Sequence, residues 1–370
     1  MKFSLLTLLL ALALAHAPRA AAQQRQPPAQ GEPAADESAL ERRADAEARA
    51  VVSICVNEGD VIVRGWDRNE VRARIGGGGT VRLLTPNVRP APRVEVRVSE
   101  ERDADLSRGR CGSNETVELT VPRGATVEVE SQSGHVEVSD VAEARVKVFS
   151  GDVEVRRVTR AAQVSCMSGD VSVSDSAGPV RVNTVSGDVE ARNLRTTSAG
   201  DDLEAKSVSG DVTIEAVGHG NVTGEATSGQ ILYTGALARG GSYDFRTISG
   251  DVTLELPADA SFNLHAKVVV SGEIVTDFPV KTIAVTSPSA SPSASPSAGA
   301  RASAMPPSPP APPSPGVEVT PPVPPAHARK VPRVRIPKDH ESARLDGTVG
   351  TGSAVVNLSS FSGSLHLRKR

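Results

Sequence analysis

The tripeptide Ser-Gly-Asp recurs through this chain and constrains its fold more than any other feature of the sequence. Between Ser133 and Ser271 the corresponding serines follow one another after 17, 18, 18, 23, 19, 21 and 22 residues. Self-similarity at about 20 residues indicates a solenoid, in which each unit buries its apolar side only by stacking on its neighbours. The five complete copies are Ser150-Gly151-Asp152, Ser168-Gly169-Asp170, Ser186-Gly187-Asp188, Ser209-Gly210-Asp211 and Ser249-Gly250-Asp251.

Apolar and polar residues alternate with a period of two on both sides of each tripeptide. Val146 and Val148 precede the first complete copy at alternate positions, and Val153 and Val155 follow it in the same way. This period is typical of strands, whereas a helix would show a period of 3.6. Each unit therefore predicts a strand, a sharp corner and a second strand. The whole chain predicts an all-β fold, a single-stranded β-helix (β-solenoid) of about ten coils.

The residue directly before each serine is apolar, although strict alternation would place it on the outside. One interpretation, which we favour, is a β-bulge at the corner that turns these side chains inward. The other is an exposed apolar stripe that marks a partner surface. The residues concerned are Phe149, Met167, Val185, Val208, Ile248 and Val270.

Stacked coils place equivalent residues about 4.8 Å apart, so the aspartates of the tripeptides should form a ladder. Carboxylates at that distance repel one another by roughly 0.9 kcal/mol in bulk water, and something must offset this. We expect a structural role, in which glycine supplies a positive φ and the Asp side chain accepts hydrogen bonds from turn N–H groups. A calcium ladder is the second interpretation, although this ion takes six to eight oxygen ligands and the known calcium-binding repeat is shorter.

The sequence offers little that would support catalysis. Glycoside hydrolysis needs two carboxylates at a defined separation, whereas a ladder repeats one environment many times. The seven His residues show no metal-ligand spacing, and no Gly-x-Ser-x-Gly nucleophile elbow occurs. We therefore expect no enzyme, no cofactor and no metal site, and a carbohydrate-active β-helix enzyme stays open as an alternative.

Both ends of the chain and one internal segment depart from the repeat. Residues 1–22 have a basic start, a short apolar run and an Ala-rich cleavage site, which predict a signal peptide and export to the periplasm or cell surface. Residues 23–50 predict a disordered tether, residues 51–286 the solenoid, and the Pro/Ser/Ala-rich residues 287–339 a disordered insertion. Residues 340–370 return to the strand pattern, and we expect them to form the final coil and a basic tail, docked on the coil that ends near Val280. No later run is apolar for long enough to give a transmembrane segment.

Three cysteines in an exported chain leave one over when a disulfide forms. Cys55 and Cys111 lie outside the repeat, and we expect them to pair. Cys166 occupies a repeat position that small side chains fill in the other units, so the sequence predicts a buried free thiol.

Composition supports the same fold and excludes one class of partner. The chain has one Trp, two Tyr and six Phe against 32 Gly and 27 Pro, so its core must be thin and built from medium side chains. The formal charge is −3 with both signs interspersed, unlike the basic stripe of a nucleic-acid binder. We expect Trp66 to be an aromatic lid over the first coil, with a sugar-stacking platform as the alternative.

Together these features resemble the bacterial putative-adhesin domain, a β-solenoid family of unknown function. The resemblance covers about residues 51–286 and 340–368. It rests on four motifs in order, which are "GDVIVRGWDRNEVRARI", the serial "VSGDV" corners, "GEIVTDFP" at Gly272–Pro279, and "LDGTVGTGSAVVNLSSFSGSL". The long Pro/Ser insertion departs from the usual pattern. The resemblance implies a surface or periplasmic scaffold and does not name a ligand.

The sequence thus predicts a non-catalytic, exported cell-envelope scaffold or adhesin-like binding module. Its partner would be an envelope polysaccharide or a surface protein that meets a flat polar face. The alternative is a self-assembling structural β-solenoid, which would stack end to end through exposed coil edges.

Overall fold

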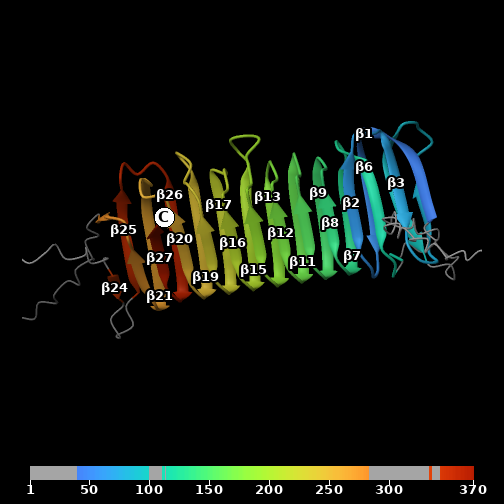
Figure 1. Ribbon diagram of the computed structural model, residues 1–370. Coiled ribbons are helices and arrows are strands. Elements are labelled where there is room, and N and C mark those ends of the chain that lie inside the picture. Colours follow the sequence, from blue (N-terminus) through green and yellow to red (C-terminus); the bar gives the residue numbers. More distant parts are fainter. Residues whose placement is uncertain (1–39, 100–110, 113, 283–332, 336–341) are drawn as a thin grey trace, which may run out of the picture. The chain divides into compact units, whose positions relative to one another are not determined.

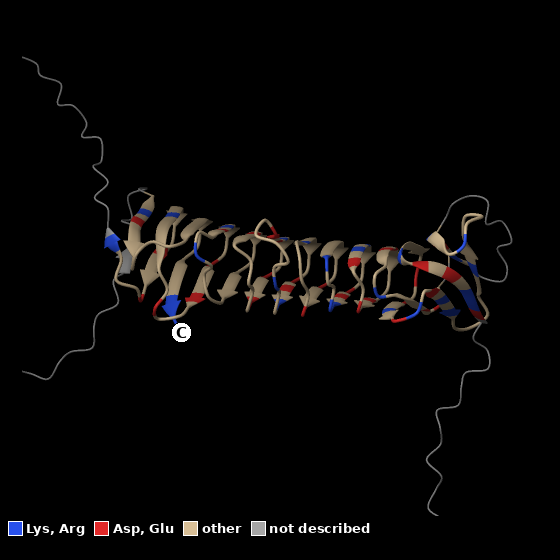
Figure 2. Cartoon of the chain, turned by 90° about the horizontal axis from the view of Figure 1, so that it is seen from above, with Lys and Arg blue, Asp and Glu red and all other residues tan. Residues whose placement is uncertain are grey.

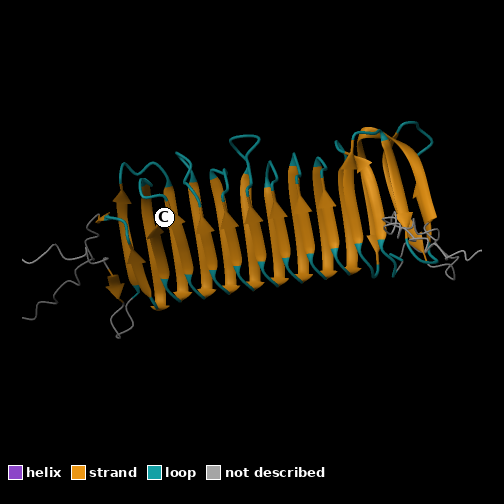
Figure 3. Ribbon diagram, in the orientation of Figure 1, coloured by secondary structure: helices purple, strands orange, loops and turns teal. Residues whose placement is uncertain are grey.

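The computed structural model describes residues 40–99, 111–112, 114–282, 333–335 and 342–370, and the regular elements in this part of the chain are all β-strands (Figure 3). No helix among these residues is long and apolar enough to cross a membrane. The strands are β1 (Leu40–Val56), β2 (Val61–Trp66), β3 (Glu70–Ile75), β4 (Thr80–Leu84), β5 (Ala91–Ser99), β6 (Val117–Pro122), β7 (Thr126–Ser133), β8 (Val136–Ser139), β9 (Glu143–Ser150), β10 (Val153–Arg156), β11 (Ala161–Ser168), β12 (Val171–Ser174), β13 (Val180–Ser186), β14 (Val189–Arg192), β15 (Asp202–Ser209), β16 (Val212–Glu215), β17 (Asn221–Ser228), β18 (Ile231–Thr234), β19 (Ser242–Ser249), β20 (Val252–Leu256), β21 (Phe262–Ser271), β22 (Glu273–Thr276), β23 (Lys281–Thr282), β24 (Arg333–Arg335), β25 (Ala343–Val349), β26 (Val355–Ser362) and β27 (Leu365–Lys369).

Two sheets run through the stack of coils, and each coil contributes one strand to each sheet (Figure 1). The long-strand sheet has the order β4-β5-β1-β7-β9-β11-β13-β15-β17-β19-β26-β21-β25-β23. The short-strand sheet has the order β1-β3-β6-β2-β8-β10-β12-β14-β16-β18-β20-β27-β22-β24. The predicted all-β solenoid is therefore confirmed.

Equivalent residues of successive coils pair with one another, and their apolar side chains fill the space between the sheets. Val153 pairs with Val171, for example, and both are buried. Every second position of β10 and of β12 is buried, as the period of two requires. Larger side chains enter this Val-rich core at Tyr233, whose ring centroid lies 5.6 Å from that of Tyr243 and 5.4 Å from that of Phe245.

The corner between the two strands of a coil is built around glycine. Gly187 has a φ of +134°, a conformation that residues with a Cβ rarely adopt. A Cβ at this position would lie 2.1 Å from the carbonyl oxygen of Gly169 in the neighbouring coil. An added Cβ would come similarly close to the carbonyl oxygen of an adjacent coil's corner glycine at every other corner. These corners carry Gly134, Gly151, Gly169, Gly210, Gly229, Gly250, Gly272 and Gly363. The corners are therefore aligned from one coil to the next.

The C-terminal coil is inserted into the stack. β26 pairs with β19 on one side and with β21 on the other, and β27 lies in the same way between β20 and β22. We expected residues 340–370 to form the final coil, docked on the coil that ends near Val280. They do pair with that coil, but β26 and β27 are not final, because coil β21–β22 lies beyond them and only β25 pairs with the outer side of β21. The insertion of about fifty residues gives the chain enough length to return past its own last coil, and long loops cost little additional closure entropy.

A similar insertion occurs at the other end, where coil β1–β2 lies between β5 and β7 in one sheet and between β6 and β8 in the other. Antiparallel strands extend the sheets beyond the parallel coils at each end. These are the first half of β1 with β3 and β4 at one end, and β23, β24 and β25 at the other.

The solenoid begins before residue 51. We expected a disordered tether through residue 50, but β1 starts at Leu40, and Ala46 and Ala50 are fully buried. Alanine alternates with charged residues here and has a low strand propensity, so pairing with β3 and β5 decides the structure. The predicted signal peptide (residues 1–22), the rest of the tether (23–39) and nearly all of the predicted insertion (287–332 and 336–339) lie outside the described residues.

Candidate binding surface

The apolar residues directly before the corner serines point outward. The exposed fraction is 59% for Phe149, 47% for Met167 and 54% for Ile248. The favoured interpretation of an inward-turning bulge was therefore wrong. Alternation continues through the ridge residue, and the small residue one position earlier, such as Cys166, already fills the space inside. We call this row the corner ridge, which consists of Phe149, Met167, Val185, Val208, Ile248, Phe361 and Val270.

A register shift does occur at one of these corners. β21 has one residue more than β26 between Val268 and Ser271. Val269 and Val270 are 36% and 50% exposed, so the extra residue enlarges the corner ridge instead of hiding it.

Two open grooves adjoin the corner ridge on the outer face of the long-strand sheet. One has a volume of about 650 Å³ and lies between ridge residues, including Val208 and Phe361, and the charged side chains of Lys206 and Arg246. The other has a volume of about 500 Å³ and is lined by the ridge near Phe149. Apolar and charged groups therefore meet along the same edge of the sheet.

A row of polar and charged side chains flanks the corner ridge on this sheet. Lys206 Nζ lies 2.7 Å from Glu204 Oε1 and 3.2 Å from Glu225 Oε2. The hydrogen bond with Glu204 is the main cause that raises the pKa of Lys206, and the same bond lowers the pKa of Glu204. We call the row the flanking row, and its members in coil order are Glu130, Lys147, Ser165, Asn183, Lys206, Glu225, Arg246, Ser359 and Lys267.

On the other side of the corner ridge, the aspartates of the tripeptides form hydrogen bonds between coils. The N–H of Asp170 donates to Asp152 Oδ1 at 3.0 Å, and the N–H of Asp188 donates to Asp170 Oδ1 at 2.8 Å. Asp211 and Gln230 continue this series, each through its own N–H. The donor belongs to the neighbouring coil rather than to the turn of the aspartate itself, so each of these carboxylates ties two coils together.

His135 and Gln230 occupy corners where the other coils have aspartate. Each donates its N–H to a carboxylate of an adjacent coil, His135 to Asp60 and Gln230 to Asp211. Within the described part of the chain neither side chain offers an acceptor to the next corner, and the ladder resumes at Asp251, which accepts from the N–H of Ser364. Acidic positions recur along the stack in Figure 2. A groove of about 480 Å³ separates these corner carboxylates from the outer face of the short-strand sheet.

Two of the histidines in the described residues, His219 and His265, have structural partners. His265 Nδ1 lies 2.9 Å from Asp346 Oδ1, and Arg344 donates to the other oxygen of that carboxylate. His219 is fully buried, with Nε2 2.9 Å from the carbonyl oxygen of Gly178. No group of three or more His, Cys, Asp or Glu side chains in this part of the chain is arranged to hold a metal ion.

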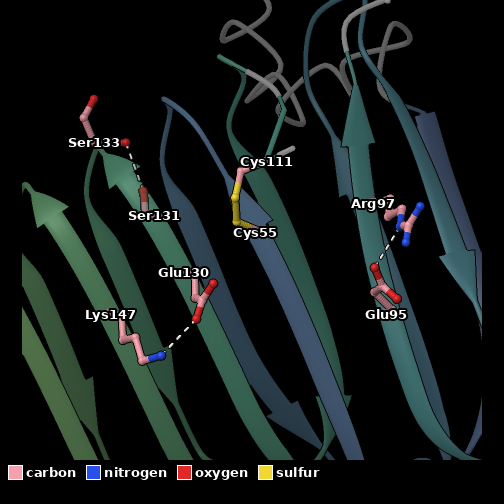
Figure 4. Close-up of a disulfide and its surroundings, with 8 residues drawn as sticks. All are labelled: Cys55, Glu95, Arg97, Cys111, Glu130, Ser131, Ser133 and Lys147. Atoms are coloured by element: carbon pink, nitrogen blue, oxygen red, sulfur yellow. Dashed lines mark hydrogen bonds and ion pairs between the residues drawn. A yellow bond between two sulfur atoms is a disulfide. The ribbon is translucent and has the colours of Figure 1, made fainter. Parts of the chain in front are cut away.

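Cys55 and Cys111 form a disulfide beside the long-strand sheet, next to the ion pair between Glu130 and Lys147 (Figure 4). Both half-cystines line the groove that reaches Phe149, so the bond lies at one end of the corner ridge. Cys166 is free and buried, and its burial raises the pKa of the thiol.

Trp66 is partly buried at the end of β2. The guanidinium carbons of Arg68 and Arg72 lie 5.0 and 4.8 Å from its ring centroid, and its Nε1 donates to the carbonyl oxygen of Glu70. The prediction of a lid over the first coil was wrong about its place, because β2 lies between β6 and β8 inside the stack. Two cations at the ring also leave less of it open to a sugar.

Repeated coils, antiparallel end strands and outward rows of equivalent residues define a β-solenoid that carries open grooves on its outer faces. The model of the Toastrack DUF4097 family matches residues 93–297, which is more than half of the chain. The chain belongs to this family, and the resemblance to a solenoid family of adhesin-like domains is confirmed.

Two solved structures are similar to this chain at low sequence identity. A putative adhesin from Bacteroides fragilis NCTC 9343 is 16% identical with a TM-score of 0.38, and the match covers 60% of this chain and 97% of that one. A putative cell adhesion protein from Clostridium sporogenes ATCC 15579 is 8% identical with a TM-score of 0.17, covering 90% of this chain and 100% of that one. No curated protein matches the chain.

Proposed function

We propose that this protein is a non-catalytic, exported cell-envelope scaffold that binds an envelope polysaccharide in the manner of an adhesin. The signal features of residues 1–22 support export. The ligand would lie along the outer face of the short-strand sheet and its groove, and would meet hydrogen-bonding groups from several coils.

The observation that carries this proposal is the regular polar outer face of the short-strand sheet. β10 presents Glu154 and Arg156 outward, β12 presents Ser172 and Ser174, and their neighbours repeat the arrangement. The groove of about 480 Å³ runs beside Glu154 and Ser172. A polymer with repeating hydroxyl groups can engage several coils at once, and such weak contacts add up through effective concentration.

Retention of the full chain on envelope polysaccharide tests the proposal. Ser172→Trp fills the groove and should weaken retention at least tenfold, because several coils then lose contact with the ligand. Gln163→Trp makes the same change at an exposed position of the long-strand sheet and should leave retention unchanged. Equal retention of both variants would contradict binding of the polysaccharide at the short-strand sheet. Retention by envelope protein alone would identify a protein partner instead.

We also propose that the main role of the corner carboxylates is structural, because they accept hydrogen bonds that join neighbouring coils. Asp170→Ala removes the acceptor for the N–H of Asp188 and should lower the free energy of unfolding by about 1 kcal/mol. Asp170→Asn keeps an acceptor oxygen and should change the free energy of unfolding by less than about 0.5 kcal/mol. Denaturant unfolding measures both, and an equal loss in the two variants would show that the charge itself is required.

A further inference from the structure

In the seven coils from β7 to β20, the flanking-row residue, the ridge-position residue and the corner residue change together along the stack. In the five coils with a complete Ser-Gly-Asp, the ridge residue is apolar and the flanking-row residue is basic or neutral. Two coils have neither the aspartate nor the apolar ridge residue, and their flanking-row residue is glutamate. These coils carry Glu130-Gln132-His135 and Glu225-Thr227-Gln230. Because equivalent residues are in register, this is a pattern on the surface as well as in the sequence.

The corner ridge is an apolar surface that nothing in the described chain covers. Its central residue Val208 is 47% exposed and Phe361 is 49% exposed. Half-exposed side chains of this kind present on the order of 100 Å² each. The seven ridge residues together therefore approach the roughly 800 Å² per partner of a standard protein interface.

We propose that the corner ridge is the interface of a homodimer in which two copies of this chain lie side by side with parallel solenoid axes. A two-fold axis parallel to the stack brings each coil opposite the same coil of the partner and exchanges the two sides of the ridge. It thus sets the flanking row of one copy against the corner residues of the other. The same-coil pairs are Lys147 with Asp152, Lys206 with Asp211, and Arg246 with Asp251.

The two exceptional coils fit this arrangement as well. Glu130 would face His135, and Glu225 would face Gln230, so neither glutamate meets a carboxylate across the interface. An antiparallel pair would instead set the corner carboxylates of one copy against those of the other, and such like-charge contacts disfavour association. The charge pattern therefore selects the parallel dimer.

The repeat itself makes this interface uniform. Coils are spaced by about 4.8 Å in both copies, so a register established at one coil holds at every coil of the ridge. A two-fold axis also closes the assembly at two copies. The outer face of the short-strand sheet, with Glu154 and Ser172, stays outside this interface, and the corner aspartates are the part of the proposed ligand groove that the two surfaces share.

Sedimentation equilibrium of the full chain tests the proposal at concentrations from about 1 to about 100 μM. We expect a reversible dimer whose Kd rises at least tenfold in Val208→Lys, since this change puts a charge in the middle of the interface. Val88→Lys is the matched control, because Val88 is 58% exposed and lies outside the ridge. A monomer at all concentrations, or an equal effect of both variants, would overturn the proposal.

Charge reversal and cross-linking test the parallel arrangement. Lys206→Glu should weaken the dimer, and adding Asp211→Lys should restore it, although the intrachain ion pairs of Lys206 stay broken. Phe149→Cys should form a disulfide with its own equivalent, because each coil faces itself. A sample that is dimeric by sedimentation but does not cross-link at this position would overturn the arrangement. Ser172→Trp should leave the dimer intact, so this proposal and the ligand-binding proposal fail separately.

Discussion

At each corner a glycine leaves room for the carbonyl oxygen of its counterpart in the next coil, and at some corners that carbonyl oxygen also accepts a hydrogen bond from a side chain. Ser207 Oγ donates to the carbonyl oxygen of Gly187 at 3.0 Å, and Thr247 Oγ1 donates to that of Gly229 at 3.3 Å. These donors occupy the buried slot that also holds Cys166. Val148 and Ala226 fill the same slot without a donor, so small size is the shared requirement and the hydrogen bond is an addition in some coils.

Replacing a corner glycine should destabilise the coil strongly. Gly187→Ala combines a positive φ with a Cβ that would lie 2.1 Å from a carbonyl oxygen, and we expect it to lower the free energy of unfolding by about 2–4 kcal/mol. Denaturant unfolding followed by circular dichroism measures the loss. Gly200→Ala is the control, since a Cβ there meets nothing within 4 Å. A loss of similar size in both variants would contradict the stacking argument.

Asp201 makes stability depend on pH. Its carboxylate accepts hydrogen bonds from the backbone N–H and hydroxyl groups of Thr197 and Ser198, and the Ser198 hydroxyl is the main cause that lowers its pKa. A folded-state pKa below the unfolded value of about 3.9 gives stability that is present above that pH and is lost as the pH falls further. Asp201→Asn should therefore be less stable than the wild type at pH 7, and the difference should shrink below about pH 4. Unfolding curves at several pH values check this, and a constant difference would contradict it.

At the scale of elements, the order of coils in space differs from their order in the sequence at both ends. β1–β2 and β26–β27 each lie between two coils that are distant from them in the chain. In a stack of repeats, each coil is stabilised by its two neighbours. A coil inserted near an end therefore holds the outer coil in place.

Deleting residues 342–370 tests this role. The deletion removes β25, β26 and β27, so β21 and β22 lose the strands that join them to β19 and β20. We expect amide hydrogen exchange to show loss of protection in β21 and β22, with protection retained from β9 to β14. Deleting residues 295–314, in the long connection, is the control and should leave protection unchanged. Protection that persists in β21 and β22 after the first deletion would contradict an inserted coil.

At the scale of the whole molecule, the ladder of corner carboxylates is held by backbone N–H groups, and this bears on the calcium interpretation. These donors occupy one oxygen of Asp152, Asp170, Asp188 and Asp211. Calcium would need six to eight oxygen ligands at each site. We therefore expect millimolar calcium or a chelator to change the thermal midpoint by less than about 1 °C, because a ligand that does not bind the folded state cannot stabilise it. A clear rise with calcium would restore the metal interpretation.

The sequence predicts only part of the protein's surface. The exposed position of Phe149 follows from simple alternation, whereas the bulge that we favoured would have turned it inward. Alternation predicts outward polar side chains in the flanking row, as at Arg246, but not that their charges vary with the corner residue in the same coil. That signal could have been found by comparing the coils position by position.

The sequence by itself determined the repeating unit of this protein, because alternation and the corner glycine are local properties of about twenty residues. Only the tertiary structure decided which coils become neighbours. A stack of coils with equivalent strands accepts several orders, and long connections carry little entropic penalty, so the local pattern cannot choose among them. The place of β26–β27 and the inclusion of residues 40–50 depend on pairing with distant strands, and no short stretch of sequence contains that information.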